Sequence, residues 1–84
     1  MSKVWFRKTR IGTFSIMENG DRFHLIFNES ENLGSYAHPQ QASDDLALGA
    51  IPSIVLPNGK IILDTSNLGI PGDLRQWEFF EQQD

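Results

Sequence analysis

The sequence contains no cysteine, and this absence removes several classes of protein at once. Without thiols the chain forms no disulfide framework and offers no thiolate for catalysis or metal binding. It also lacks any apolar run near the roughly 20 residues that span a bilayer. The basic segment at residues 1–12 is not followed by the apolar stretch of a secretion signal. We therefore expect a soluble, cytoplasmic protein with no membrane partner.

Groups that carry catalysis are also scarce. The two histidines are His24 and His38, and neither stands in a pattern with serine and carboxylate that is typical of nucleophilic catalysis. Their spacing is not that of paired zinc ligands. The seven glycines are separated from one another and form no phosphate-binding loop. The sequence therefore predicts that the chain is not an enzyme and has no cofactor and no metal site.

Positive charge is nearly confined to one end of the chain. Four of the seven basic residues lie within residues 1–10, and the rest of the chain holds three basic residues against eleven acidic ones. A protein that coats nucleic acid needs a basic surface, so the overall charge of −4 argues against that role. The basic segment is left as a local candidate for contact with something anionic.

A length of 84 residues suits one small domain, in which folding buries about 60–65% of the surface of the unfolded chain. Residues 12–17 and 22–28 alternate apolar and polar side chains, which is the pattern of half-buried strands. Between them, the pair Asn19-Gly20 suits a hairpin turn with both central residues at positive φ. The residues expected on the buried face of this hairpin are Phe14, Phe23, Leu25 and Phe27.

A third strand and a helix are expected next. The segment "LGSYA" at 33–37 has the character of a short strand. Pro39 suits the first position of a helix, where its missing N–H would have had no partner. Gly49 suits the position just past the end of a helix. We therefore expect a helix over residues 39–48 that covers the apolar face of the hairpin.

The second half of the chain, residues 50–84, differs in composition but is expected to belong to the same domain as residues 1–49. The segment "SIVLPNGKIIL" at 53–63 has two apolar runs around Pro-Asn-Gly, which predicts a second hairpin with both sides partly covered. Pro71 is expected to open a short helical turn, and "WEFF" at 77–80 to form an edge strand or an irregular tail. The predicted fold class is α+β, an antiparallel sheet packed on one short α-helix and followed by the second hairpin and the helical turn.

The first half of the chain resembles two families of DNA-binding domain. Its predicted order of strand, turn, strand, strand and helix, with "LGSY" leading into "HPQQASDDLA", is similar to that of plant ethylene-response factors and of the arm-type domains of phage integrases. This resemblance implies a three-stranded sheet backed by a helix. The whole chain also resembles short uncharacterised bacterial and prophage proteins that share the pattern "KTRIGTF … LGSY … LGIP … W". The residues that carry the first resemblance are Gly12, Phe14, Leu33, Gly34, Tyr36, Pro39, Ala42 and Leu46.

A candidate binding face combines the exposed side of the hairpin with the basic segment. Where the DNA-binding families carry several arginines and tryptophans, this hairpin offers Arg22 and His24. Basic and aromatic side chains together also hold single-stranded nucleic acids. The other interpretation is that residues 3–9 form an edge strand whose lysines and arginines prevent aggregation. The residues of the candidate binding face are Trp5, Arg7, Lys8, Arg10, Thr13, Ser15, Arg22 and His24.

Two further features each have two interpretations. Asp44 and Asp45 lie in the middle of the expected helix, and they are either solvated residues of its exposed side or an acidic patch that engages a basic partner. Trp77, Phe79 and Phe80 either cap the sheet as part of the core or anchor a partner, as aromatic residues often do.

These observations favour a small non-enzymatic protein that binds another macromolecule, and they favour a protein over DNA as the partner. The missing catalytic patterns, the separated basic and acidic regions, and the apolar Met17 and Ile26 on the exposed side of the hairpin all point this way. The alternative is a nucleic-acid-binding module that uses the exposed sheet face and the basic N-terminal strand. The sequence itself specifies neither the partner nor the oligomeric state.

Overall fold

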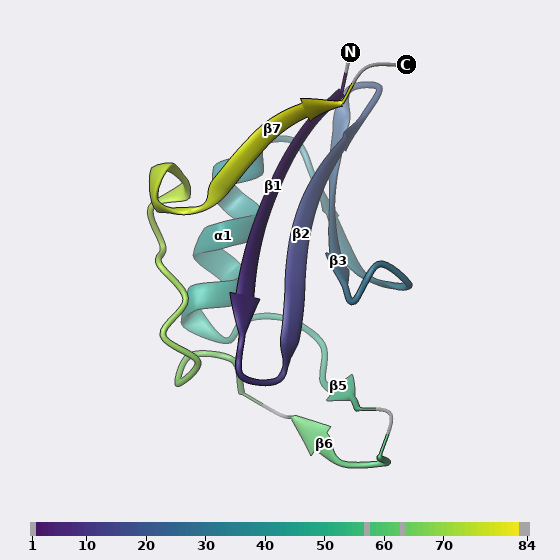
Figure 1. Cartoon of the computed structure of the whole chain (residues 1–84), viewed down its shortest axis with the longest axis vertical. Coiled ribbons are helices and arrows are strands. Elements are labelled where there is room, and N and C mark those ends of the chain that lie inside the picture. The colour runs from purple at the N-terminus through teal and green to yellow at the C-terminus, as the bar shows by residue number, and fades with distance from the viewer. Residues whose placement is uncertain (1, 57, 63, 83–84) are drawn as a thin grey trace.

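The computed structural model describes residues 2–56, 58–62 and 64–82, and it shows the predicted α+β fold (Figure 1). Seven strands, one α-helix and one 3-10 turn follow one another in these residues. No helix in the described ranges is both long enough and apolar enough to cross a membrane. The elements are β1 (Ser2–Thr9), β2 (Gly12–Asn19), β3 (Arg22–Phe27), β4 (Glu31–Tyr36), α1 (Pro39–Leu48), β5 (Ile54–Val55), β6 (Ile61–Ile62), η1 (Leu74–Gln76) and β7 (Glu78–Gln82).

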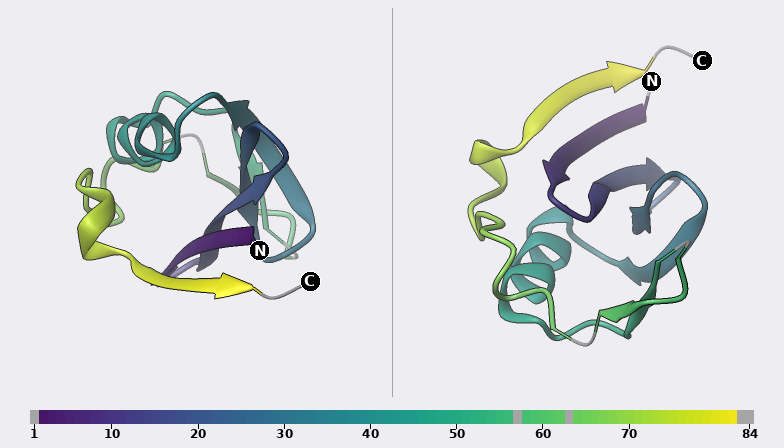
Figure 2. Two further views of the ribbon diagram at one scale, coloured as in Figure 1. Left: turned by 90° about the horizontal axis from the view of Figure 1, so that it is seen from above. Right: turned by 60° about the horizontal axis from the view of Figure 1, so that its bottom comes forward.

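Five of the strands form one antiparallel sheet in the order β4-β3-β2-β1-β7. The last strand of the chain therefore lies beside the first, which Figures 1 and 2 both show. Of the two alternatives for residues 77–80, an edge strand or an irregular tail, the structure shows the edge strand, as β7. The interpretation of residues 3–9 as an edge strand is wrong, because β7 pairs with residues 2–6 of β1 on the side that β2 leaves open.

The predicted hairpin of β2 and β3 is confirmed, but its turn lies one residue later than expected. Asn19 still pairs with Arg22, so the central residues of the turn are Gly20 and Asp21. Gly20 alone has a positive φ, of 64°, and Asn19 keeps the extended backbone of the strand. The expectation of two central residues at positive φ is therefore wrong.

The core lies between the sheet and α1, and Figure 2 shows the sheet curving around the side that holds the helix. Phe14 and Leu25 of the hairpin are fully buried, while Phe23 is only partly buried. The helix contributes Ala42 and Leu46, both fully buried. Its predicted bounds are confirmed. The other buried apolar residues of the core cluster are Ile16, Phe27, Leu33, Ile54, Ile70, Leu74 and Trp77, so both halves of the chain contribute.

Polar contacts tie the second half of the chain to α1. The Gln40 side chain donates to the carbonyl of Gly72 through Nε2 and accepts from the backbone N–H of Leu74 through Oε1 at 3.2 Å. The buried hydroxyl of Thr65 donates to the carbonyl of Leu46 at 2.6 Å. Because these partners lie 19 to 34 residues apart in sequence, the contacts hold the irregular segment between β6 and η1 against the helix.

The hairpin of β5 and β6 is confirmed, with Ile54 paired to Ile62 and Val55 paired to Ile61. Ile54 is fully buried, whereas the side chains of Val55 and Ile61 are 55% and 57% exposed. One side of this hairpin therefore faces the core, and the other side is covered only in part. Pro57 of the predicted turn lies outside the described residues.

Candidate binding face of the sheet

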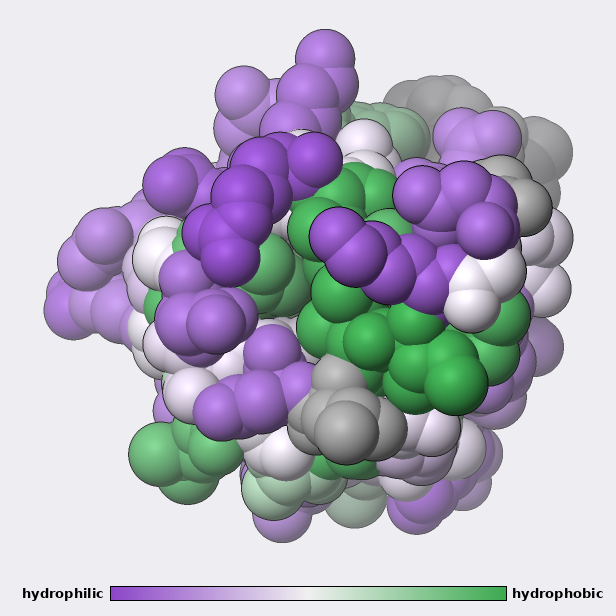
Figure 3. All heavy atoms as spheres, turned by 90° about the horizontal axis from the view of Figure 1, so that it is seen from below, coloured by the Kyte–Doolittle hydropathy of each residue, from purple (hydrophilic) through white to green (hydrophobic). Residues whose placement is uncertain are grey.

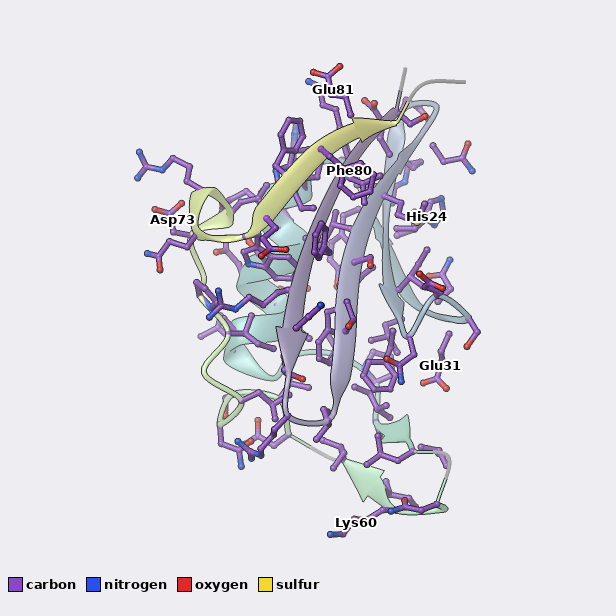
Figure 4. All side chains as sticks on the ribbon, viewed as in Figure 1. His24, Glu31, Lys60, Asp73, Phe80 and Glu81 are labelled. Carbon is purple, nitrogen blue, oxygen red and sulfur yellow. The ribbon has the colours of Figure 1, made fainter. Side chains whose placement is uncertain are left out.

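The face of the sheet opposite α1 carries a second set of apolar side chains, and it faces the viewer in Figure 4. Residues alternate between the two faces along a strand, so the neighbours of buried Phe14 and Ile16 point away from the helix. Two cross-strand pairs on this outer face are Val4 with Met17 and Phe6 with Ser15. Phe80 of β7 stands beside Val4 on the same face.

These side chains line a hollow of about 780 Å³, which we call the outer groove. Its apolar lining comes from Val4, Phe6, Met17 and Phe80. The rings of Phe6 and Phe80 pack edge to face with their centroids 5.7 Å apart. Val4 is only 5% exposed although it lies on the face without a helix. The polar residues around this lining are Lys8, Thr13, Ser15, Asn28 and Glu29.

The loop after β3 forms one end of the outer groove. Asn28 and Glu29 are the non-glycine residues with positive φ in the described chain, at 51° and 67°. Asn28 is held against β2 because its N–H donates to the carbonyl of Thr13 at 2.8 Å and its Oδ1 accepts from the N–H of Thr13 at 3.0 Å. The groove therefore has a firmly placed end with one acidic side chain, Glu29.

The structure brings five of the eight predicted binding residues to this outer face. Lys8, Thr13 and Ser15 line the outer groove itself. Arg22 and His24 point to the same side from β3 but are engaged with β4. Arg22 donates to the Ser35 side chain and carbonyl, both at 2.9 Å, and the His24 Nδ1 lies 3.2 Å from the amide nitrogen of Asn32.

The other three predicted residues lie elsewhere. Trp5 and Arg7 point to the helix side of the sheet, since they pair with Ile16 and Phe14. Trp5 packs there against Phe79, with ring centroids 5.1 Å apart, and against Phe23, 6.1 Å away. Arg10 lies in the turn after β1, where its guanidinium donates to the carbonyl of Asn67 at 3.2 Å. The basic segment is therefore divided among three surfaces.

Sequence reasoning did not include Phe6 and Phe80 in the binding face. The signal was present, because alternation along β1 places Phe6 on the same side as Val4 and Lys8. For Phe80 the missing information was the pairing of β7 with β1, which brings it next to Phe6. The three C-terminal aromatics divide as follows: Trp77 is a core residue whose Nε1 donates to the Pro71 carbonyl, whereas Phe79 and Phe80 are about half exposed.

The acidic pair of the helix lies on a different surface. Asp44 is exposed and accepts from Gln40 Nε2 at 2.9 Å, while Asp45 is partly buried beside Tyr36. Burial first, and then the negative charge and hydrogen bond of Asp45, raise the pKa of the Tyr36 hydroxyl. Both carboxylates border a smaller hollow of about 370 Å³ that also includes Arg22. Asp44 and Asp45 thus stay a separate candidate patch, away from the outer groove.

The histidines are not brought together with catalytic partners. His24 lies in β3 and contacts Asn32, while His38 is exposed at the N-cap of α1 and makes no capping hydrogen bond with its side chain. Within residues 2–56, 58–62 and 64–82, no group of three His, Asp or Glu side chains is placed to hold a metal ion.

A second exposed apolar surface lies at the opposite end of the molecule from the chain termini. Figure 3 shows hydrophobic side chains gathered over the end formed by β5 and β6. Ile61 contributes to this surface, and Arg10 and Lys60 border the same hollow, which measures about 640 Å³. This surface is distinct from the outer groove because β1 and β2 do not supply their outward side chains to it.

Comparison of the chain with protein-family models, curated proteins and solved structures finds no match. The resemblance to ethylene-response factors, integrase arm-type domains and short prophage proteins therefore stays a prediction.

Proposed function

We propose that this chain is a small non-enzymatic binding module that docks another protein on the outer face of its sheet. The observation that carries the proposal is the outer groove, where Phe6, Met17 and Phe80 offer apolar surface next to polar side chains. Aromatic and methionine side chains are enriched in protein interfaces, where polar residues lie beside them. The partner we infer is a protein that presents apolar side chains to this groove.

The charges at the border favour a protein over a nucleic acid. Lys8 and Glu29 border the groove with opposite signs. A phosphate backbone needs several cations together. The residues expected to contact nucleic acid are instead divided among the outer groove, the β3–β4 side, the helix side and the β1–β2 turn; they are Trp5, Arg7, Lys8, Arg10 and Arg22. Opposite charges beside apolar side chains suit a protein partner.

A photo-crosslinking amino acid at Ser15 tests the proposal in the cells that encode this chain. Ser15 lines the outer groove, whereas exposed Ser66 lies in the segment after β6 and is the matched control position. We expect a protein adduct of one defined mass from position 15 and none from position 66. Adducts that nuclease removes, or the absence of any adduct from position 15, would contradict the proposal.

A variant of the groove provides the second arm. Phe6→Thr keeps a residue suited to a strand but removes the ring that packs on Phe80. We expect it to abolish the adduct from position 15. Ile61→Thr is the control, because it removes an exposed apolar side chain from the other apolar surface, and it should leave the adduct unchanged.

A further inference from the structure

Strand β7 is an edge of the sheet, and no strand lies on its outer side in the described chain (Figures 1 and 2). We infer that this edge accepts an extended segment of the partner protein as a sixth strand, and that the segment carries side chains in the order basic, apolar, apolar, basic. The inference deepens the proposed function, because it names how the partner is held and which chemistry it presents.

The two edges of the sheet differ in regularity. β7 pairs with β1 at five consecutive positions, from Glu78 to Gln82, without a shift in register. β4 pairs with β3 through a register shift between Leu25 and Ile26. Such irregularities disrupt the row of hydrogen-bonding groups and protect an edge from further pairing. β7 is therefore the edge with the regular backbone that an added strand requires.

Two half-exposed rings mark the same edge. Phe79 and Phe80 are 49% and 46% exposed, and they point to opposite faces of the sheet. Each ring already packs on an aromatic ring of β1, Phe79 on Trp5 and Phe80 on Phe6. The outer side of each ring is left to water. Apolar side chains of an added strand would cover that side on both faces at once.

The acidic residues of β7 define the charge of the segment. Glu78 lies on the same face as Phe80, and Glu81, labelled in Figure 4 above Phe80, lies on the same face as Phe79. Charged side chains on an edge strand repel a strand of like charge, so these two carboxylates exclude acidic segments and favour basic ones. Each face of the edge thus offers one acid and one aromatic ring.

On its inner side, β7 already pairs with a strand that carries a basic residue next to apolar ones, namely β1. Lys3 stands opposite Glu81 and Val4 stands opposite Phe80. Trp5 then stands opposite Phe79. On this inner side Glu78 stands opposite Phe6, so β1 supplies a basic partner for one of the two glutamates. An added strand with a basic residue opposite each glutamate and apolar residues opposite the two rings extends this complementarity to both acids on the outer side. Because Phe80 also lines the outer groove, outward side chains of the added strand continue into that groove.

The test uses capped, fluorescently labelled peptides and the full chain, with binding measured by anisotropy. The basic probe is Thr-Lys-Val-Val-Arg-Thr, and the acidic probe has Glu in place of Lys and Arg. We expect saturable binding of the basic probe and at least about tenfold weaker binding of the acidic one. Equal binding of both probes, or no binding of the basic one, would overturn the inference.

Charge-reversed variants locate the site. Glu78→Lys/Glu81→Lys is expected to exchange the preference, so that the acidic probe binds better than the basic one. Asp21→Lys/Asp44→Lys changes the net charge equally on two exposed residues away from β7 and should keep the original preference. If this control exchanges the preference instead, the helix or turn is the site and the inference is overturned. Should the reversed variant not fold, Glu78→Gln/Glu81→Gln is expected to remove the preference.

Backbone methylation of the basic probe distinguishes strand addition from other binding modes. In an antiparallel edge pairing, alternate residues direct their N–H groups to the neighbouring strand. We therefore expect N-methylation of one alternate set to abolish binding and of the other set to preserve it. Loss with both sets or with neither would overturn strand addition. Sedimentation of the free protein completes the test, since self-association abolished by Glu78→Lys/Glu81→Lys would assign the edge to a second copy instead.

The two proposals fail separately. If Phe6→Thr leaves the adduct from position 15 intact while the basic probe binds as expected, the outer groove is wrong and the edge inference stands. If the adduct forms as expected but the basic probe does not bind, the groove stands and the edge inference is overturned.

Discussion

Leu46 and Leu48 lie two positions apart in α1 and provide a matched pair of substitutions for the packing of the helix. The side chain of Leu46 is fully buried, whereas that of Leu48 is 75% exposed. Replacement of a buried leucine by alanine removes apolar contacts and leaves a cavity, at a cost of about 2–5 kcal/mol. The same replacement on an exposed position of a helix changes stability by less than about 0.5 kcal/mol.

The expected difference is large for a domain of this size. With 84 residues, the free energy of unfolding is on the order of 4–13 kcal/mol. Leu46→Ala should therefore remove a large share of it and lower the melting temperature by roughly 10–40 °C. Leu48→Ala should shift the melting temperature by less than about 4 °C. Urea unfolding followed by circular dichroism and by tryptophan fluorescence, to which buried Trp77 contributes, measures both variants.

The slope of the unfolding free energy with urea concentration serves as the control, since an unchanged slope means that the same surface is exposed on unfolding. Equal losses of stability in the two variants, or a loss below about 1 kcal/mol for Leu46→Ala, would refute the assignment of the buried face of α1. The measurement bears on function as well, because the outer face of the sheet is free only if the helix covers the other face.

Three further predictions use the same folded protein. Gly12→Ala should cost about 1–3 kcal/mol and clearly more than Gly20→Ala. Both glycines have a positive φ, but a Cβ at Gly12 would lie 2.5 Å from Oδ1 of Asn28, whereas a Cβ at Gly20 would meet open space. Urea unfolding measures the stability of both variants. Gln40→Glu should cost about 0.5–1.5 kcal/mol in the same assay, because a carboxylate then faces the carbonyl to which the amide donates. Burial and Asp45 raise the pKa of the Tyr36 hydroxyl, so the folded state binds its proton more tightly than the unfolded state does. The protonated hydroxyl therefore favours the folded state. This stabilisation is fully present below the ordinary tyrosine pKa and is lost as the pH rises through the pKa of the folded state. Since this is the one tyrosine of the chain, the ultraviolet absorbance of tyrosinate reports it directly, and Asp45→Asn should lower its pKa towards, but not to, the ordinary value.

The parts of the fold that could be predicted have local signals. The helix bounds follow from Pro39 and Gly49. Gly49 adopts a left-handed φ of 78°, which lets the N–H of Ala50 return to the carbonyl of Asp45 at 2.8 Å. The hairpin follows from alternation that puts Leu25 and Phe27 on one side. Its turn was misplaced by one residue because one glycine at positive φ suffices there, and Asn19 gains a cross-strand partner by staying in the strand.

The pairing of β1 with β7 could not be located from local patterns. Its partners, such as Val4 and Phe80, lie at opposite ends of the chain, and no turn residue between them specifies the contact. One indication was available, because Val4, Trp5 and Phe6 are three consecutive apolar residues. Consecutive apolar residues place apolar side chains on both faces of a strand, which is more typical of a strand inside a sheet than of an edge strand.

The candidate binding face was only partly predictable for the same reason. Trp5 and Arg7 were grouped with Lys8, although alternation along one strand separates them. Alternation along β1 does not say which of its two faces lies against the helix. The pairs of β1 with β2 decide it, because they place Trp5 and Arg7 beside the buried Ile16 and Phe14. The aromatic residues of the outer groove come from both termini, so their meeting is a property of the closed sheet.

In the described residues, the elements that pack on the sheet lie on one of its faces. The ten-residue helix α1 lies on that face, and Ile54, Ile70 and Leu74 join the same core cluster. The apolar side chains of the outer face therefore shelter one another, as Phe6 and Phe80 do, and stay partly in contact with water. A polar surface would cost the domain little and would protect it from aggregation. The proposal of a protein partner therefore rests on the apolar side chains at an exposed groove and beside a regular strand edge.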